Sequence, residues 1–140
     1  MSSAIVKKES QLTFDLDNVP GTLAKVADAL KTAGVSIEGI CYTESSEKSQ
    51  TANLVVDKTE VAKTALEAMG MSVTAGDIVS LEFTEDRPGI IAAVAHMLGD
   101  AAVNIENIYT AASGLGKPAK FYVAVAKADF EKALQIAQGM

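Results

Sequence analysis

The chain has 140 residues, a hydrophobic content of 49% and a formal net charge of −6 at pH 7. Its length fits one ordinary domain or two small domains of about 65 residues each. The acidic balance, with Arg87 as the only arginine, argues against binding to nucleic acids or anionic membranes, because phosphate recognition needs clustered Lys and Arg.

No apolar run approaches the roughly 20 residues of a membrane-spanning helix, and residues 1–8 lack the apolar centre of a signal peptide. We therefore expect a soluble cytoplasmic protein. The single cysteine, Cys41, excludes an internal disulfide and a Cys-based metal cluster, which fits a reducing compartment.

The first predicted strand begins at Gln11, after a short apolar patch at residues 4–6. Its apolar residues alternate with polar ones, which predicts one buried face. The strand stops at a turn, Asn18-Val19-Pro20-Gly21, where Pro20 sets φ near the value of a first helical turn. Because Gly21 has no Cβ, the free N–H groups of the following helix stay open to a small or anionic group.

The predicted helix ends at Gly34, and its inward face holds Leu23, Val26, Ala27, Leu30 and Ala33. The next strand, over residues 35–42, breaks its alternation at Gly39, which indicates a β-bulge. Residues 43–49 are polar and form a predicted hairpin loop.

A third strand is expected over residues 51–56, then a helix capped by Asp57 or Thr59 and ended by Gly70, then a fourth strand over residues 71–75. Gly76 and Asp77 form a brief joint to the second half. The order is β-α-β-β-α-β, the split βαβ or ferredoxin-like arrangement, in which both helices cover one face of an antiparallel sheet.

The second half repeats the first. Residues 88–108 are identical to residues 20–40 at eleven of twenty-one positions without a gap, which indicates an internal duplication. We expect strands over residues 78–84, 103–111 and 120–126, a hairpin loop over 113–118, and helices over 88–101 and 129–138. The first of these helices should point Ile91, Val94, Ala95 and Leu98 inward, and the bulge should recur at Asn107.

The chain ends before a fourth strand of the second unit. An unpaired sheet edge would remain, and the apolar patch at residues 4–6 has no other evident partner. We therefore predict that residues 3–8 pair with the sheet of the second unit or with the edge of a partner chain. The expected domains are 11–76 and 77–140, with residues 1–10 as an N-terminal segment.

With both turns in view, the sequence resembles the ACT-domain family, and in particular small stand-alone proteins made of two ACT domains in tandem. The resemblance rests on Asn18-Val19-Pro20-Gly21-Thr22-Leu23-Ala24 with residues 33–37, and on Glu85-Asp86-Arg87-Pro88-Gly89-Ile90-Ile91 with residues 101–105. It covers residues 11–138. It implies an α+β fold of two tandem ferredoxin-like (βαββαβ) units, each an antiparallel sheet with its helices on one face.

The resemblance also implies regulation rather than catalysis, because small ligands of the family, typically amino acids, bind where the strand 1–helix 1 turn meets a neighbouring domain. Carried over by position, the ligand contacts are the Asx residue before each Pro, the Gly after it, the next two residues, and the polar residue that opens strand 2. These are Asn18, Gly21, Thr22, Leu23 and Ser36 in the first copy, and Asp86, Gly89, Ile90, Ile91 and Asn104 in the second.

Each of these residues also has a structural interpretation. Asn18 and Asp86 could cap their helices, and the two glycines could serve close packing of helix on sheet. Asn104 favours a polar contact, because the interior of a strand disfavours Asn. The lone His96 and Arg87 are expected at the surface.

An enzyme needs a nucleophile–base pair or paired carboxylates in a cleft, and the single His96 and Cys41 fall on different predicted elements. We therefore expect no catalysis, cofactor or metal. Two functions remain open: an amino-acid-sensing regulatory module, and a protein-interaction or assembly module without a ligand that acts on a metabolic enzyme. A homodimer and an enzyme of amino-acid metabolism are the expected partners.

Overall fold

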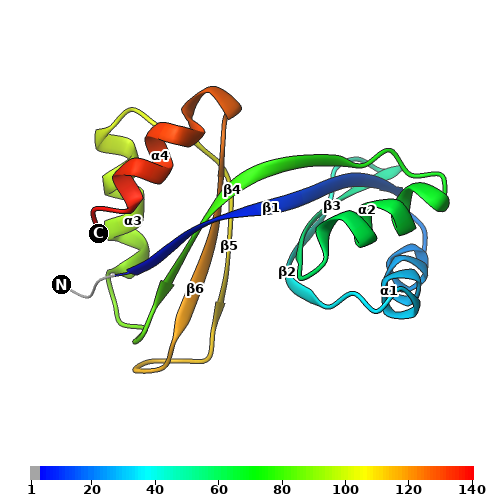
Figure 1. Cartoon of the computed structure of the whole chain (residues 1–140), viewed down its shortest axis with the longest axis horizontal. Coiled ribbons are helices and arrows are strands. Elements are labelled where there is room, and N and C mark those ends of the chain that lie inside the picture. The colour runs from blue at the N-terminus through cyan, green and yellow to red at the C-terminus, as the bar shows by residue number, and fades with distance from the viewer. Residues whose placement is uncertain (1–3) are drawn as a thin grey trace. The chain divides into compact units, whose positions relative to one another are not determined.

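The computed structural model describes residues 4–140, which form an α+β fold of six strands and four α-helices, with one short 3-10 helix (Figure 1). The elements are β1 (Ala4–Asp17), α1 (Thr22–Thr32), β2 (Ile37–Glu44), β3 (Ser49–Val56), α2 (Thr59–Ala68), β4 (Thr74–Phe83), α3 (Ile90–Asp100), β5 (Ile105–Ala112), β6 (Ala119–Val125), η1 (Lys127–Asp129) and α4 (Phe130–Ala137).

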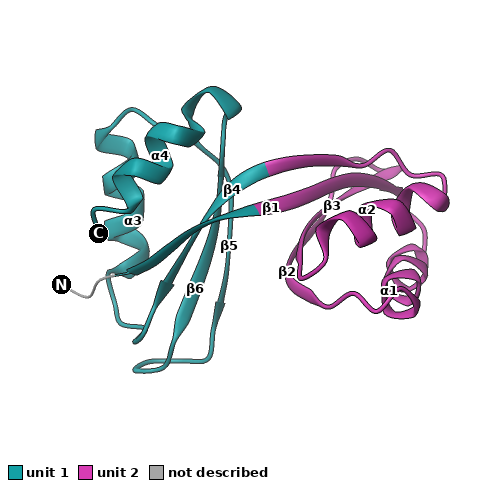
Figure 2. Cartoon of the chain, viewed as in Figure 1, with its two compact units in different colours: residues 1–9, 77–140 teal, residues 10–76 magenta. Residues whose placement is uncertain are grey.

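The chain divides into two compact units (Figure 2). Unit 1 comprises residues 77–140 together with the N-terminal segment up to Glu9, and unit 2 comprises residues 10–76. Both boundaries fall inside a strand, because β1 and β4 each run without a break from one unit into the other.

This continuity corrects two expectations from the sequence. The predicted strands over residues 71–75 and 78–84 are one strand, β4, which begins at Thr74, and the first strand begins at Ala4 rather than at Gln11. Gly76 and Asp77 are typical turn residues, but both keep extended backbone within β4. Glycine accepts extended backbone as readily as a turn, so composition alone misplaced the joint.

Unit 2 has its elements in the order β-α-β-β-α-β, with the strands arranged as β2-β3-β1-β4. The pairs β1/β3 and β2/β3 are antiparallel, with Leu54 of β3 opposite both Leu12 and Ile40. Alternate residues of β1 and β3 face α1 and α2, and together they form the core of the unit. Its buried residues are Leu12, Phe14, Leu16, Val26, Leu30, Val35, Ala52, Leu54, Val56, Ala62 and Leu66.

In unit 1, β4, β5 and β6 are joined by the N-terminal half of β1, in the order β1-β4-β6-β5. Ala4 and Val6 pack against the core of this unit, whereas Ile5 between them is exposed. This alternation gives residues 4–6 one apolar face toward the core. Residue 3, the first of the predicted segment 3–8, lies outside the described residues.

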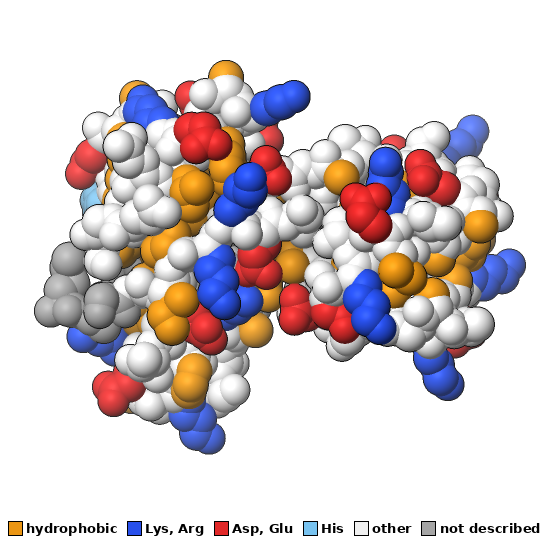
Figure 3. All heavy atoms as spheres, viewed as in Figure 1, with side chains coloured by type: hydrophobic (Ala, Val, Ile, Leu, Met, Phe, Trp, Pro, Cys, Tyr) orange, Lys and Arg blue, Asp and Glu red, His pale blue; other side chains and the backbone are white. Residues whose placement is uncertain are grey.

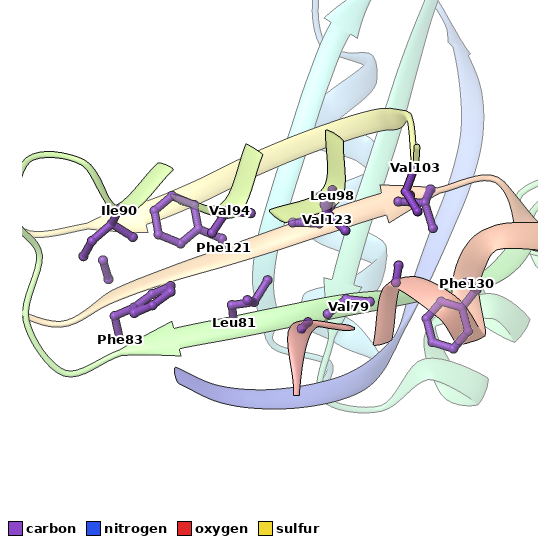
Figure 4. Packing of buried hydrophobic residues seen from close by; sticks show 14 residues of the cluster. Val79, Leu81, Phe83, Ile90, Val94, Leu98, Val103, Phe121, Val123 and Phe130 are labelled. Carbon is purple, nitrogen blue, oxygen red and sulfur yellow. The ribbon is translucent and has the colours of Figure 1, made fainter. Parts of the chain in front are cut away.

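The core of unit 1 lies between the sheet and the helices α3 and α4 (Figure 4). Ile90, Val94 and Leu98 form the inward stripe of α3 and face β6, where Phe121 and Val123 lie. The sequence predicted Ile91 and Ala95 in this stripe, and both are exposed. Since α3 carries apolar residues nearly all round, the apolar period could not fix which face is buried.

Other local predictions are confirmed. The register slips between Ile37 and Gly39 and again between Ile105 and Asn107, which is the repeated bulge. Gly34 follows α1 with φ +74 and donates its N–H to Lys31 O at 3.0 Å.

No helix in residues 4–140 is both long and apolar enough to cross a membrane.

Candidate functional site

Each strand-to-helix turn ends in a glycine with left-handed backbone. Gly21 (φ +93) precedes α1 and Gly89 (φ +96) precedes α3. Such backbone favours glycine, because a Cβ would crowd the following carbonyl. Within the described residues neither helix has a side-chain cap, so Asn18 and Asp86 do not act as N-caps.

The first helical turns therefore keep free donors. In the described part of the chain, the N–H groups of Leu23 and Ala24 in α1, and of Ile91 and Ala92 in α3, meet no protein acceptor. The Ile90 N–H makes only a long bond of 3.4 Å, to Arg87 O. Both helix N-termini thus present unpaired donors at the positive end of the helix dipole.

The two Asx side chains differ in what surrounds them. Asn18 Nδ2 donates to Glu44 Oε2 at 2.8 Å, to Glu47 O at 3.2 Å and to Ser46 O at 3.3 Å. The Asn18 N–H also donates to Lys48 O at 3.0 Å. Asn18 therefore ties its turn to the β2–β3 hairpin.

A second set of hydrogen bonds closes the first turn. Thr22 Oγ1 lies 3.1 Å from Asp17 O and 3.2 Å from Val19 O, and its hydroxyl lies 3.4 Å from that of Tyr42. The Tyr42 hydroxyl donates to Gln50 Oε1. The start of α1 is thus bound to its own turn and to the ends of β2 and β3.

At the second turn only the backbone is held. The Asp86 N–H donates to Lys117 O at 2.5 Å, and the Gly116 N–H donates to Asp86 O at 2.8 Å. Among the described residues the Asp86 carboxylate has no hydrogen-bond or ion-pair partner, and the side chain is half-buried. Ile90, which takes the place of Thr22, lies in the core and can offer a ligand only its backbone.

The structure does not bring Ser36 or Asn104 to the turn of its own unit. The turn after β1 lies level with the end of β2, because Asp17 pairs with Ser49 and Glu44 with Gln50. The other end of β2, at Ile37, lies about 23 Å along the strand from Glu44, at about 3.3 Å per residue. Ser36 precedes that end. Asn104 stands in the same relation to β5, so within one unit neither Ser36 nor Asn104 joins the other predicted ligand contacts of its copy.

Both residues also lie outside their strands. Asn104 is exposed and precedes β5. The inference of a polar contact assumed that Asn104 lies inside a strand, so it does not hold. The Ser36 N–H donates to Asp57 Oδ1 at 2.8 Å and Ser36 O accepts from the Asp57 N–H at 3.1 Å. Asp57 therefore holds the start of β2 and does not cap α2, whose N-cap is Lys58.

Sequence reasoning missed the residues that do lie at the turns. The register places Glu44 and Tyr42 beside the first turn, and Ala112 and Thr110 beside the second. The available signal was the hairpin itself, since residues next to an antiparallel hairpin loop lie level with the end of the neighbouring strand.

Charges on the drawn face are mixed: Figure 3 shows basic and acidic side chains interspersed, without a continuous basic area. Lys120 Nζ of β6 lies 3.2 Å from Glu9 Oε2 of β1. Partial burial lowers the pKa of Lys120, but the Glu9 carboxylate and Tyr122 together outweigh this effect and raise the pKa above its ordinary value. The pair links the N-terminal half of β1 to the sheet of unit 1.

Neither a metal site nor a cavity in the core offers another candidate. Within residues 4–140 no group of three or more His, Cys, Asp or Glu side chains could hold a metal ion. A gap beneath α3 and α4, lined by Val79, Leu81, Met97, Leu98, Val123, Ala133 and Ala137, is apolar and has no room for a water molecule.

Similarity to solved structures extends over the whole chain. A protein from Bacteroides thetaiotaomicron superposes with a TM-score of 0.81 at 24% identity over 97% of this chain and 89% of that chain. The regulatory subunit of aspartate kinase from Thermus thermophilus, in its ligand-free form, gives 0.72 at 22% identity over 99% and 97%.

Aspartokinase III of E. coli, in complex with lysine and aspartate, gives a TM-score of 0.55 at 17% identity over 97% of this chain and 32% of that chain. At these identities the likeness concerns the fold. No curated protein matches the chain. The comparison with protein families is more specific: residues 79–138, which run from β4 through α4 in unit 1, match the ACT domain.

Proposed function

We propose that this chain is an amino-acid-sensing regulatory protein made of two ACT domains in tandem. The proposed domains are residues 11–76 and 77–140, the second completed by the N-terminal half of β1. The family match over residues 79–138 supports the second domain. The repeated β-α-β-β-α-β order and the internal sequence repeat support the first.

The observation that carries the proposal is the Asp86 turn. Among the described residues, the Asp86 carboxylate has no partner and lies in the same turn as the free N–H groups that begin α3. A free amino acid carries an ammonium and a carboxylate on one carbon. The helix N-terminus suits its carboxylate, and Asp86 suits its ammonium.

Two of the structurally similar proteins fit a regulatory role. One is a regulatory subunit of aspartate kinase, and another is an aspartokinase in complex with lysine and aspartate. By analogy, the partner of this chain is an enzyme of amino-acid metabolism, whose activity changes when the amino acid binds. The chain itself has no catalytic role in this proposal.

Thermal-shift measurements with each of the twenty L-amino acids test the proposal. A ligand at 100 times its Kd stabilises the folded state by about 2.7 kcal/mol. Asp86→Asn keeps the shape of the side chain and removes its charge, so it should weaken binding about 10- to 100-fold. Glu85→Gln, which removes the charge of the exposed neighbour, is the matched control and should bind as the wild type does.

If no amino acid stabilises the wild type, the alternative takes its place: an assembly module that binds an enzyme without a small ligand. The same result with Asp86→Asn as with Glu85→Gln would leave amino-acid sensing intact but remove the assignment to this turn.

A further inference from the structure

We draw no further inference here: the strongest candidate, the exposed apolar face of α3 formed by Ile91, Ala92 and Ala95, carries nothing because no feature of the part of the chain that the structure describes shows what covers it.

Discussion

At the scale of single residues, the ends of the helices show how the two copies diverged. Among the described residues, Ala102 is the one non-glycine with positive φ, at +58. The equivalent position after α1 is Gly34, at +74. A Cβ in left-handed backbone costs about 1–2 kcal/mol, so the second copy retains strain that the first copy lacks.

Ala102→Gly should therefore stabilise the protein. The relief of strain exceeds the extra freedom that glycine gives the unfolded chain, and we expect a net gain of about 0.5–1 kcal/mol. Ala101→Gly is the control, because Ala101 has negative φ and glycine there should destabilise. Urea unfolding of both variants measures the difference, and a loss of stability in Ala102→Gly would contradict the prediction.

The ion pair of Lys120 and Glu9 predicts a dependence on pH. Because the folded state raises the pKa of Lys120 above its ordinary 10.5, the contribution of the pair is fully present below that pH and is lost as the pH rises through the folded-state pKa. The difference in unfolding free energy between the wild type and Glu9→Gln, about 1 kcal/mol, should shrink on passing from neutral to strongly alkaline pH. A constant difference would show that the pair contributes nothing.

At the scale of elements, β1 has two roles. Its C-terminal half supplies Leu12, Phe14 and Leu16 to the core of unit 2, and its N-terminal half supplies Ala4 and Val6 to unit 1. The N-terminal half also covers the edge of β4 that the rest of unit 1 leaves open. Since an exposed edge is prone to pair with other chains, this segment is needed for a closed sheet.

Single substitutions test the role of the N-terminal half. Val6→Asp places a charge against the core of unit 1 and should cost about 2–3 kcal/mol. Ile5→Asp changes the exposed neighbour on the opposite face and should stay within about 0.5 kcal/mol of the wild type. Deletion of residues 1–8 should lower the melting temperature further; equal melting of the wild type and Val6→Asp would exclude a packing role for the segment.

At the scale of the whole molecule, several large apolar side chains remain exposed at or near the two turns. Val19 is 54% exposed, Ile91 50% and Leu115 75%. Burial of such side chains against a second chain would remove apolar surface from water, and two-fold symmetric dimers are the commonest soluble oligomers.

We expect a homodimer. Sedimentation equilibrium at micromolar concentration should give a mass near twice the 14.6 kDa of one chain, and the mass should fall toward that of the monomer on dilution. A single species of monomer mass across the whole concentration range would remove the prediction.

The sequence by itself determined the local structure. Period-two alternation in residues 11–17, the Pro-Gly turns and the glycines after the helices are short-range signals, because strand period and left-handed backbone depend on neighbouring residues only. The repeat showed that the same order of elements occurs twice, and the shared break in alternation predicted both bulges. The candidate turns at residues 18–21 and 86–89 were found in this way.

Tertiary structure decided the rest, because it depends on residues far apart in the sequence. The pairing of strands places Glu44 beside Asn18, and Ser36 lies before the opposite end of β2. No local sequence pattern indicates either position. The same pairing makes β1 continuous past Gln11, where the sequence predicted the start of the strand. It also makes β4 continuous through Gly76 and Asp77, where the sequence predicted a joint. On α3, where almost every residue is apolar, only packing against β6 selects Ile90 over Ile91 for the core.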